Sequence, residues 1–260
     1  MSLTANNISL SRTDKTILEH VSLDIEPGIV TALIGPNGAG KTSLMRIMTG
    51  EMNPDDGDVA INGLRLRRLS FAELARVRAV MTQSSHVVFD FRVDEILRMG
   101  WVQGSRWNQE AMAQAIDQVT AACDIEDLIG RTFNTLSGGE QQRVQFARAL
   151  LQIWRPSGSR EARYLMLDEP TSSLDLAHEL IVLKLAREKA GKNIGVLVVL
   201  HDLNLAARFA DRVCLLKAGE IVAEGRPEQV FEDRLLTGVY GTTICVEQSQ
   251  RFDRLLIHSM

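Results

Sequence analysis

The chain has 260 residues, 45% of them hydrophobic and 24% charged, which is an ordinary globular mixture long enough for one large domain. Its formal net charge of −4 argues against sequence-independent nucleic-acid binding, which needs a basic face. Three widely spaced cysteines form no metal-binding pattern, and their odd number fits a reducing cytosol. We expect no signal peptide and no membrane span, because the apolar run at 194–200 is too short to cross a bilayer.

The first third of the chain is predicted to join an antiparallel β layer to a strand–loop–helix unit. Residues 3–10 and 21–25 have the pattern of short strands, and residues 55–63 have the turn chemistry of a hairpin. Residues 30–34 form an apolar run typical of a buried strand. A glycine-rich loop follows, and residues 41–49 are predicted to form a helix.

The middle of the chain is predicted to be helical and the last part to alternate strands with helices. Residues 92–129 contain few β-branched runs, and residues 137–154 form an amphipathic pattern. A polar loop, WRPSGSREAR at 154–163, separates this part from the next. The apolar run before Asp168, a helix over 176–190 and the apolar run at 194–200 then suggest a parallel sheet. Residues after about 225 are expected to form a small cap on that sheet.

The stretch GPNGAGKTS fits the phosphate-loop pattern G-x-x-x-x-G-K-[ST] between a strand and a helix. Its glycines allow backbone N–H groups to turn inward around phosphates, and the helix N-terminus favours the same anion. The lysine is expected to reach the terminal phosphates, and the threonine to ligate Mg²⁺. The predicted nucleotide-binding residues are Gly35, Pro36, Asn37, Gly38, Ala39, Gly40, Lys41, Thr42 and Ser43.

A second apolar run, YLMLDEP, ends in two adjacent carboxylates. Asp168 is predicted to stand at the strand tip beside the phosphate loop and to hold Mg²⁺ directly or through water. Glu169 is predicted to polarise the attacking water as general base. The alternative is a strand that ends in a solvated turn before Pro170.

The stretch LSGGE combines a helix start with two costly glycines. Ser137 and Glu140 form a capping box, which is the purely structural interpretation. Gly138 and Gly139 each destabilise the helix by roughly 1 kcal/mol relative to alanine. Without side chains, they leave backbone N–H groups accessible at the helix N-terminus, where the helix dipole is positive. The chain already has one phosphate loop, so a second helix N-terminus suited to phosphate predicts that the γ-phosphate is contacted from two sides, by two copies of the chain.

Together these motifs resemble the ATPase subunit of ABC transporters, and the resemblance covers nearly the whole chain. It is carried by GPNGAGKT, LSGGEQQR, LMLDEP, a lone Gln83, the run Ser172–Asp175 and His201. The resemblance implies an α/β fold: a P-loop NTPase core with a RecA-like, mostly parallel sheet, an antiparallel β subdomain and a helical signature subdomain. We expect one ABC ATPase domain over 1–260, with the core and β subdomain at approximately 1–85 and 160–260 and the helical subdomain at approximately 86–155.

The resemblance also implies roles for individual residues. Two subunits are expected to sandwich ATP head to tail, so that Ser137, Gly138 and Gly139 contact the γ-phosphate held by the partner. Gln83 matches the residue that touches Mg²⁺ and the water and senses the membrane subunit; the alternative is a surface glutamine. His201 matches a histidine on the γ-phosphate, and the alternative is a helix cap. Asp175 matches the loop that links the two sites.

One departure from the family pattern concerns the base of the nucleotide. An aromatic residue usually stacks on adenine about where Ser11 and Arg12 stand, and this chain has none there. Arg12 is predicted to stack through its guanidinium plane instead. We therefore expect weaker discrimination between ATP and GTP than is usual in the family.

The resemblance is nearest to ATPases of haemin importers, within the group that imports iron chelates and cobalamin. The segments ARVRAVMTQSSHVVFDFRVDEILRMGW, EPTSSLDLAHELIVLKLAR and the long stretch LLQIWRPSGSREARY carry it. The expected complex has a homodimer of this ATPase, two integral-membrane permease subunits and a periplasmic substrate-binding protein. It places the ATPase at the cytoplasmic face of the inner membrane, with no direct haem contact and no nucleic acid.

The alternatives remain open at this point. A ferric-siderophore or cobalamin importer would share every motif above. A soluble ABC ATPase acting on DNA or ribosomes would usually carry coiled-coil insertions or two ATPase halves, and neither is present. An ATPase scaffold for iron–sulfur assembly would not fractionate with membranes.

Overall fold

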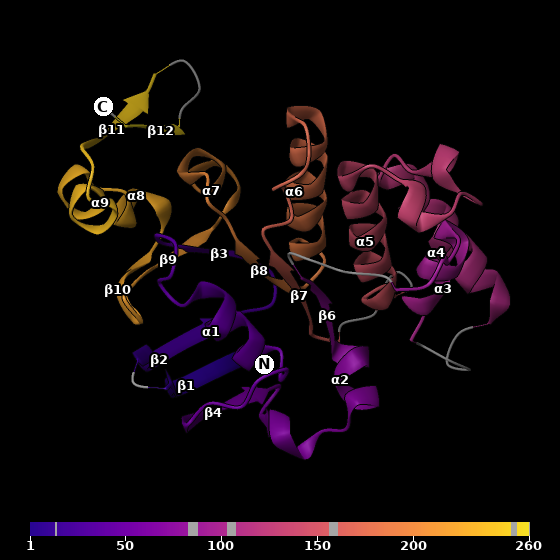
Figure 1. Ribbon diagram of the computed structural model, residues 1–260, viewed down its shortest axis with the longest axis horizontal. Helices are drawn as coiled ribbons and strands as arrows, with labels where there is room; N and C mark the ends of the chain where they lie inside the picture. The colour runs from indigo at the N-terminus through magenta and orange to yellow at the C-terminus, as the bar shows by residue number, and fades with distance from the viewer. Residues whose placement is uncertain (14, 83–87, 103–107, 156–160, 251–253, 260) are drawn as a thin grey trace.

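The computed structural model describes residues 1–13, 15–82, 88–102, 108–155, 161–250 and 254–259. Its N-terminal layer is an antiparallel sheet with the strand order β2-β1-β4-β5 (Figure 1). The sheet is formed by β1 (Leu3–Arg12), β2 (Lys15–Ile25), β4 (Asp56–Ile61) and β5 (Leu64–Arg65). Asn62 and Gly63 both have positive φ between β4 and β5, as a tight hairpin turn requires, so the predicted hairpin is confirmed.

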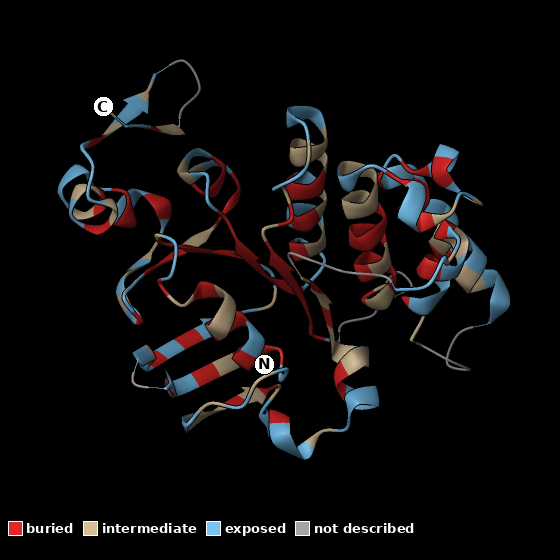
Figure 2. Ribbon diagram, viewed as in Figure 1, coloured by how far each residue is buried: buried red, intermediate tan, exposed pale blue. Residues whose placement is uncertain are grey.

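The central layer is a six-stranded sheet with the order β10-β9-β3-β8-β7-β6. Five of its strands are mutually parallel, and β10 pairs antiparallel at one edge. The strands are β3 (Val30–Ile34), β6 (Arg78–Met81), β7 (Arg163–Asp168), β8 (Ile194–Val199), β9 (Arg212–Lys217) and β10 (Glu220–Gly225). Every residue of β3, β7 and β8 is buried, because helices or the second sheet cover both faces (Figure 2).

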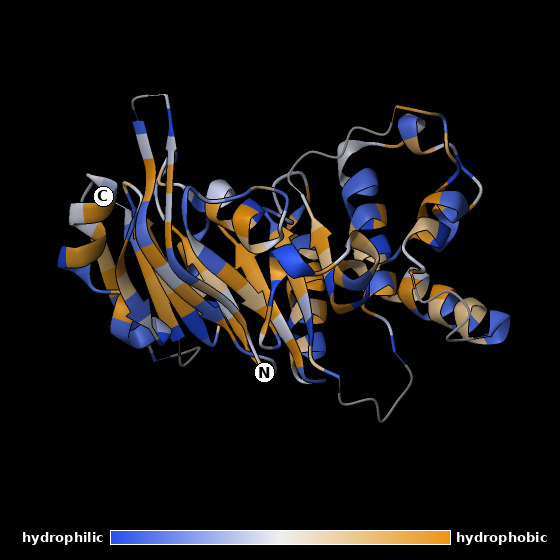
Figure 3. Ribbon diagram, turned by 90° about the horizontal axis from the view of Figure 1, so that it is seen from below, coloured by the Kyte–Doolittle hydropathy of each residue, from blue (hydrophilic) through white to orange (hydrophobic). Residues whose placement is uncertain are grey.

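Two hydrophobic cores lie on opposite faces of the central sheet. On one face, α1 (Lys41–Met48) packs between the central sheet and the antiparallel sheet. On the other face lie α6 (Leu176–Ala190), α7 (Leu203–Phe209) and the long helix α5 (Gly138–Gln152). Figure 3 shows hydrophobic residues running along the strands, with polar residues on the outer turns of the helices. The predicted mostly parallel α/β core and the antiparallel layer are therefore confirmed.

The middle of the chain is helical, as predicted, and forms the part of the molecule drawn in magenta (Figure 1). It contains α3 (Val93–Met99), α4 (Gln109–Ala122) and the start of α5, with 3₁₀ turns at Glu126–Leu128 and Phe133–Thr135. A short α2 (Phe71–Val77), preceded by a 3₁₀ turn at Leu66–Arg68, leads into β6. The division into subdomains at about residues 85 and 160 stays a prediction.

Two parts of the chain differ from the sequence-based expectation. Strand β2 begins at Lys15 and not near residue 21, since its first half is an exposed edge rich in polar residues that hides the strand pattern. Beyond residue 225, the cap consists of α8 (Pro227–Val230) and α9 (Asp233–Tyr240), followed by an unpredicted hairpin of β11 (Ile244–Ser249) and β12 (Arg254–Ser259). Asn204 on α7 holds this hairpin through both backbone groups of Ile257.

The predicted polar loop ends one residue earlier than expected, because Arg163 is buried and begins β7. All three cysteines are free; Cys123 and Cys214 are buried, and burial raises the pKa of the Cys123 thiol to about 12. In the loop at 154–163, residues 156–160 lie outside the described part. At its start, the Trp154 ring packs against Trp101 with ring centroids 5.5 Å apart.

Candidate functional site

The loop from Gly35 to Ser43 joins the end of β3 to the start of α1. Gly35 and Gly40 both have positive φ, and a Cβ at Gly35 would stand 2.0 Å from the carbonyl oxygen of Leu216. Gly40 is the N-cap of α1, where no side chain caps the helix. The first N–H groups of α1 therefore have no intrahelical acceptor and point toward the loop, as an anion site requires.

Lys41 is buried and folds back over this loop. Its ammonium Nζ donates to the carbonyl oxygens of Gly35 at 2.7 Å and Pro36 at 3.1 Å. Burial lowers the pKa of Lys41, while the nearby carboxylates of Glu169 and Asp168 act in the opposite direction. The ammonium is therefore hydrogen-bonded to two neutral carbonyl oxygens of the loop. A negatively charged phosphate oxygen can replace them as a stronger hydrogen-bond acceptor.

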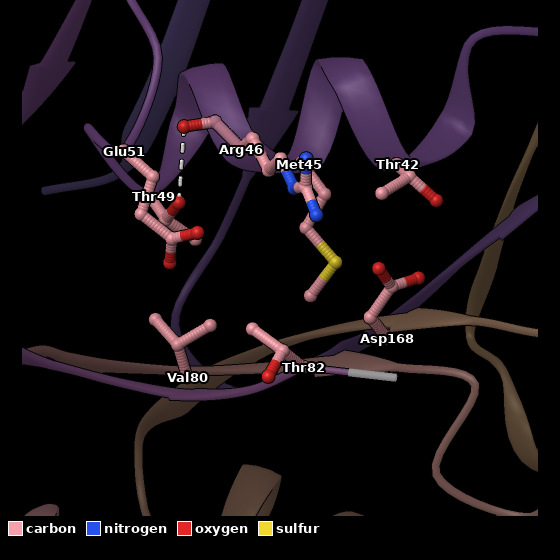
Figure 4. A pocket seen from close by; sticks show the side chains of 8 residues that line it. All are labelled: Thr42, Met45, Arg46, Thr49, Glu51, Val80, Thr82 and Asp168. Atoms are coloured by element: carbon pink, nitrogen blue, oxygen red, sulfur yellow. Dashed lines mark hydrogen bonds between the residues drawn. The ribbon is translucent and has the colours of Figure 1, made fainter. Parts of the chain in front are cut away.

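Asp168 ends β7 and faces Thr42 at the start of α1 (Figure 4). Its carboxylate lies opposite the Thr42 side chain, and its buried Oδ1 has no hydrogen-bond partner among the described residues. Burial and then the charge of Glu169 raise the pKa of this carboxyl. A buried, unpartnered carboxylate oxygen beside a hydroxyl is the donor set that Mg²⁺ prefers, so these residues fit a magnesium ion.

A polar cavity of about 110 Å³ opens beside Asp168, between α1 and the sheet edge. Asp168, Arg46 and Thr82 are among the side chains that surround it (Figure 4). Gln83, the next residue after Thr82, lies outside the described residues. The described end of β6 nevertheless brings the chain to the rim of the proposed magnesium site, which is where the sequence predicts Gln83 to act.

Glu169 and His201 meet at the carboxyl ends of β7 and β8. The imidazole Nε2 of His201 lies 2.5 Å from the Glu169 carboxylate Oε1. The Glu169 side chain is only 12% exposed, whereas that of His201 is 47% exposed. Glu169 has φ 51°, a left-handed conformation that is unusual for a residue with a side chain. The two residues predicted to act on the γ-phosphate and the water are therefore neighbours.

The helix start at Ser137 is confirmed as a capping box. The backbone N–H of Glu140 donates to Ser137 Oγ at 3.3 Å, and the Ser137 N–H donates to the Glu140 carboxylate at 2.7 Å. Among the described residues, none of Ser137, Gly138 and Gly139 hydrogen bonds to the phosphate loop of its own chain. Their contact with a partner's nucleotide stays a prediction.

The two signature glycines have different surroundings. A Cβ at Gly139 would lie 3.0 Å from the carbonyl oxygen of Ser173, whereas a Cβ at Gly138 would meet only ordinary contacts. Gly139 therefore has a packing role inside the chain that the sequence did not reveal. Gly138 shows no such steric requirement, and contact with a phosphate stays the predicted reason for a glycine there.

Asp175 caps the start of α6 and is held by His178. The carboxylate accepts from the backbone N–H of His178 at 2.9 Å and lies 2.8 Å from its Nδ1. These hydrogen bonds lower the pKa of Asp175, and the one from the backbone N–H of His178 has the largest effect. The other ring nitrogen, Nε2, lies 3.2 Å from Asp124, which also pairs with Arg143. This link from α6 to the helical part was not predicted, because its members are scattered along the sequence.

The comparisons with known proteins identify the family. A family model described as ABC transporter matches residues 18–172. The chain is 42% identical over 249 residues to the "Hemin import ATP-binding protein HmuV" of Rhizobium meliloti (strain 1021), covering 96% of this chain and 95% of that protein. It is 45% identical over 238 residues to the protein of the same name from Agrobacterium fabrum, covering 91% and 90%. The chain belongs to the ABC transporter family.

Solved structures agree with this ABC ATPase fold. The "Structure of ATP binding subunit of ABC transporter" superposes with a TM-score of 0.79 at 24% identity, covering 94% of this chain and 96% of that one. "An inward-facing conformation of a putative metal-chelate type ABC transporter" gives 0.78 at 24% identity, covering 100% and 96%. At this identity the likeness supports the fold alone. In the part of the ABC ATPase that the structure describes, no helix has the length and apolarity to span a membrane.

Arg12 stands at the end of β1, where the ABC ATPase family usually has its aromatic residue. Its side chain is 54% exposed, and its guanidinium donates to the Ser11 carbonyl at 3.0 Å and lies 3.8 Å from Asp55. The guanidinium is exposed and its ion pair with Asp55 is long, so its planar face is accessible to a nucleotide base. Stacking on adenine stays a prediction for this ABC ATPase.

We expect Arg12→Ala to raise the Michaelis constant for ATP about fivefold, as loss of one cation–π contact implies, with little change in kcat. Steady-state kinetics with ATP and with GTP measure this effect. Asp55→Ala is the control: it removes the ionic partner of Arg12 and the acceptor of the Ser11 N–H, but it keeps the guanidinium. An unchanged Michaelis constant in Arg12→Ala would exclude Arg12 from base binding.

Proposed function

We propose that this ATPase is the motor subunit of an importer that carries haemin across the bacterial inner membrane. The observation that supports the cargo is the identity of 42–45% over nearly the full length to proteins named for hemin import. The site supports the ATPase activity of such a motor, because a phosphate loop, a buried lysine and two carboxylates lie together at the carboxyl ends of parallel strands.

The proposed roles follow from this geometry. Residues Gly35 to Ser43 wrap the phosphates of ATP, and Lys41 exchanges its two carbonyl partners for phosphate oxygens. Asp168 and Thr42, with Gln83, would hold Mg²⁺, which would neutralise phosphate charge when bound.

Hydrolysis uses Glu169 as the general base for the attacking water. The 2.5 Å pair with His201 occupies one carboxylate oxygen of Glu169. When a γ-phosphate enters, His201 turns to it as a donor, and Glu169 Oε1, no longer paired with His201, takes the proton of the water. The exchange of His201 from Glu169 to the phosphate therefore couples the base to the presence of the nucleotide.

The proposed working unit is a homodimer that closes on ATP. Ser137 and the two glycines after it contact the γ-phosphate of the partner's ATP, and Asp175 links the two sites. ATP drives this closure because it binds the closed dimer better than the open one. Two permease subunits in the membrane follow the motion, and a periplasmic protein delivers haemin to them. The ATPase is peripheral, at the cytoplasmic face.

The test is uptake in a bacterial strain that lacks this chain, with haemin, a ferric siderophore and cobalamin compared side by side. We expect only haemin use to be lost, wild type to restore it, and Lys41→Ala to fail. Selective loss of siderophore or cobalamin uptake would contradict the haemin assignment and leave the motor intact. Uptake of all three by the deletion strain would contradict the transport function itself.

A further inference from the structure

The side-chain amide of Gln142 bridges α5 to the loop that follows β7. Its Nε2 donates to the backbone carbonyl of Glu169 at 3.1 Å, and its Oε1 accepts from the backbone N–H of Ser173 at 3.0 Å. One amide thus spans both ends of a five-residue loop. The opposite amide orientation would mismatch both partners, so the two contacts together fix its orientation.

The loop that Gln142 holds has an unusual backbone at its first residue. Glu169 has φ 51°, a conformation that costs a residue with a side chain free energy unless its surroundings impose it. Within the loop, the same carbonyl of Glu169 also accepts from the Ser172 N–H at 3.3 Å. The direction of the Glu169 carboxylate depends on this backbone conformation. The hydrogen bond from Gln142 to the Glu169 carbonyl therefore helps to set that direction.

A second contact joins the same two elements less than one turn earlier on α5. At Gly139 the helix approaches so closely that a Cβ would lie 3.0 Å from the Ser173 carbonyl oxygen. Gly139 and Gln142 therefore hold the loop from neighbouring turns of the helix. The helix that begins at Ser137 is therefore joined at two places to the loop that carries Glu169.

We propose that Gln142 is a positioning residue for ATP hydrolysis. It couples the signature end of α5, which engages the partner's nucleotide, to the direction of the Glu169 carboxylate in its own site. This inference rests on the proposed function, in which Glu169 is the base and two copies close on ATP. Gln142 itself touches neither nucleotide nor water; it acts through the backbone of Glu169.

The test replaces Gln142 by methionine, which has a similar shape but can neither donate nor accept these hydrogen bonds. We expect kcat to fall about tenfold, the kinetic equivalent of one well-placed hydrogen bond, with an unchanged Michaelis constant. In the Glu169→Gln background, the same substitution should leave the ATP-driven dimer seen by light scattering unchanged. This split between rate and dimer formation separates positioning from a purely structural role.

Gln152→Met is the matched control on the same helix. Gln152 also bridges α5 to backbone carbonyls, those of Ala75 at 3.1 Å and Arg78 at 2.9 Å, but away from the loop. It should keep wild-type kcat within about twofold, since its hydrogen bonds to Ala75 and Arg78 stand at the end of α2 and the start of β6, away from the loop that carries Glu169. If Gln142→Met fails to fold, Gln142→Glu serves instead, because it keeps the acceptor for Ser173 and replaces the donor to Glu169 with a negatively charged oxygen, which should lower kcat at least as much.

Two results would overturn the proposal. One is a kcat for Gln142→Met that matches Gln152→Met, and the other is loss of the ATP-driven dimer together with the rate. Failure of the proposed function gives a different signature. In that case wild type hydrolyses no ATP, or Glu169→Gln keeps the wild-type rate, whatever stands at Gln142.

Discussion

Glu169→Gln should lower kcat for ATP hydrolysis about 10²- to 10⁴-fold, the usual contribution of a general base. The amide keeps the size of the side chain and its hydrogen bond with His201, but it cannot take a proton from water. Because Lys41, Thr42 and the loop N–H groups are untouched, we expect ATP affinity to change by less than about twofold. Single-turnover hydrolysis and equilibrium nucleotide binding measure the two quantities separately.

The matched control for this substitution is Glu188→Gln. Glu188 pairs with Lys192 at 2.5 Å, the same separation as in the Glu169–His201 pair, but on an exposed helix end. Its loss should leave kcat unchanged, since exposed ion pairs contribute little. A Glu169→Gln rate near wild type would remove Glu169 from the role of base.

Asp168→Asn should stabilise the nucleotide-free protein while it strongly lowers magnesium-dependent hydrolysis. Burial and the charge of Glu169 raise the pKa of Asp168 above its unfolded value. A carboxyl with a raised folded-state pKa opposes folding wherever it is ionised. This penalty is absent below the unfolded pKa and complete above the folded one. We therefore expect a Tm gain of about 2–4 °C at neutral pH, as about 1 kcal/mol gives for a chain of this size.

The sign of this effect can be checked by pH. The Tm advantage of Asp168→Asn should shrink as pH falls toward the pKa of Asp168, because wild type then becomes neutral as well. Hydrolysis should fall by about 100-fold or more, since a lost metal anchor costs several kcal/mol of charge stabilisation. Thermal unfolding with and without ATP and Mg²⁺ completes the test: wild type should gain Tm from the ligand, and the variant should gain much less. A variant less stable than wild type at neutral pH would contradict this interpretation of Asp168.

The sequence predicted those parts of the site whose physics is local. Gly35 and Gly40 stand where the backbone needs positive φ and close approach, so their spacing indicated the phosphate loop. The capping box of Ser137 and Glu140 is also local, because its partners are three residues apart. Apolar runs likewise predicted β3, β7 and β8, since strands buried on both faces are continuously hydrophobic.

The parts that were missed depend on contacts between distant residues. Gln142 is separated from its two partners by 27 and 31 residues, and only the packing of α5 against the loop brings them together. The second reason for Gly139 has the same origin, because the carbonyl of Ser173 arrives from another element. No pattern along one segment can indicate such a contact. The C-terminal hairpin was missed for a related reason, since Asn204 on α7 helps to hold it.

The most direct test of the two-copy ATPase site is the mass of Glu169→Gln in solution with and without ATP. Light scattering should give one chain of 28.9 kDa without nucleotide and two chains with ATP, because binding is intact and hydrolysis cannot reopen the dimer. Adding Lys41→Ala to the same chain should abolish the shift. A single-chain mass at saturating ATP would contradict a site completed by a second copy and, with it, the proposed role of Ser137, Gly138 and Gly139.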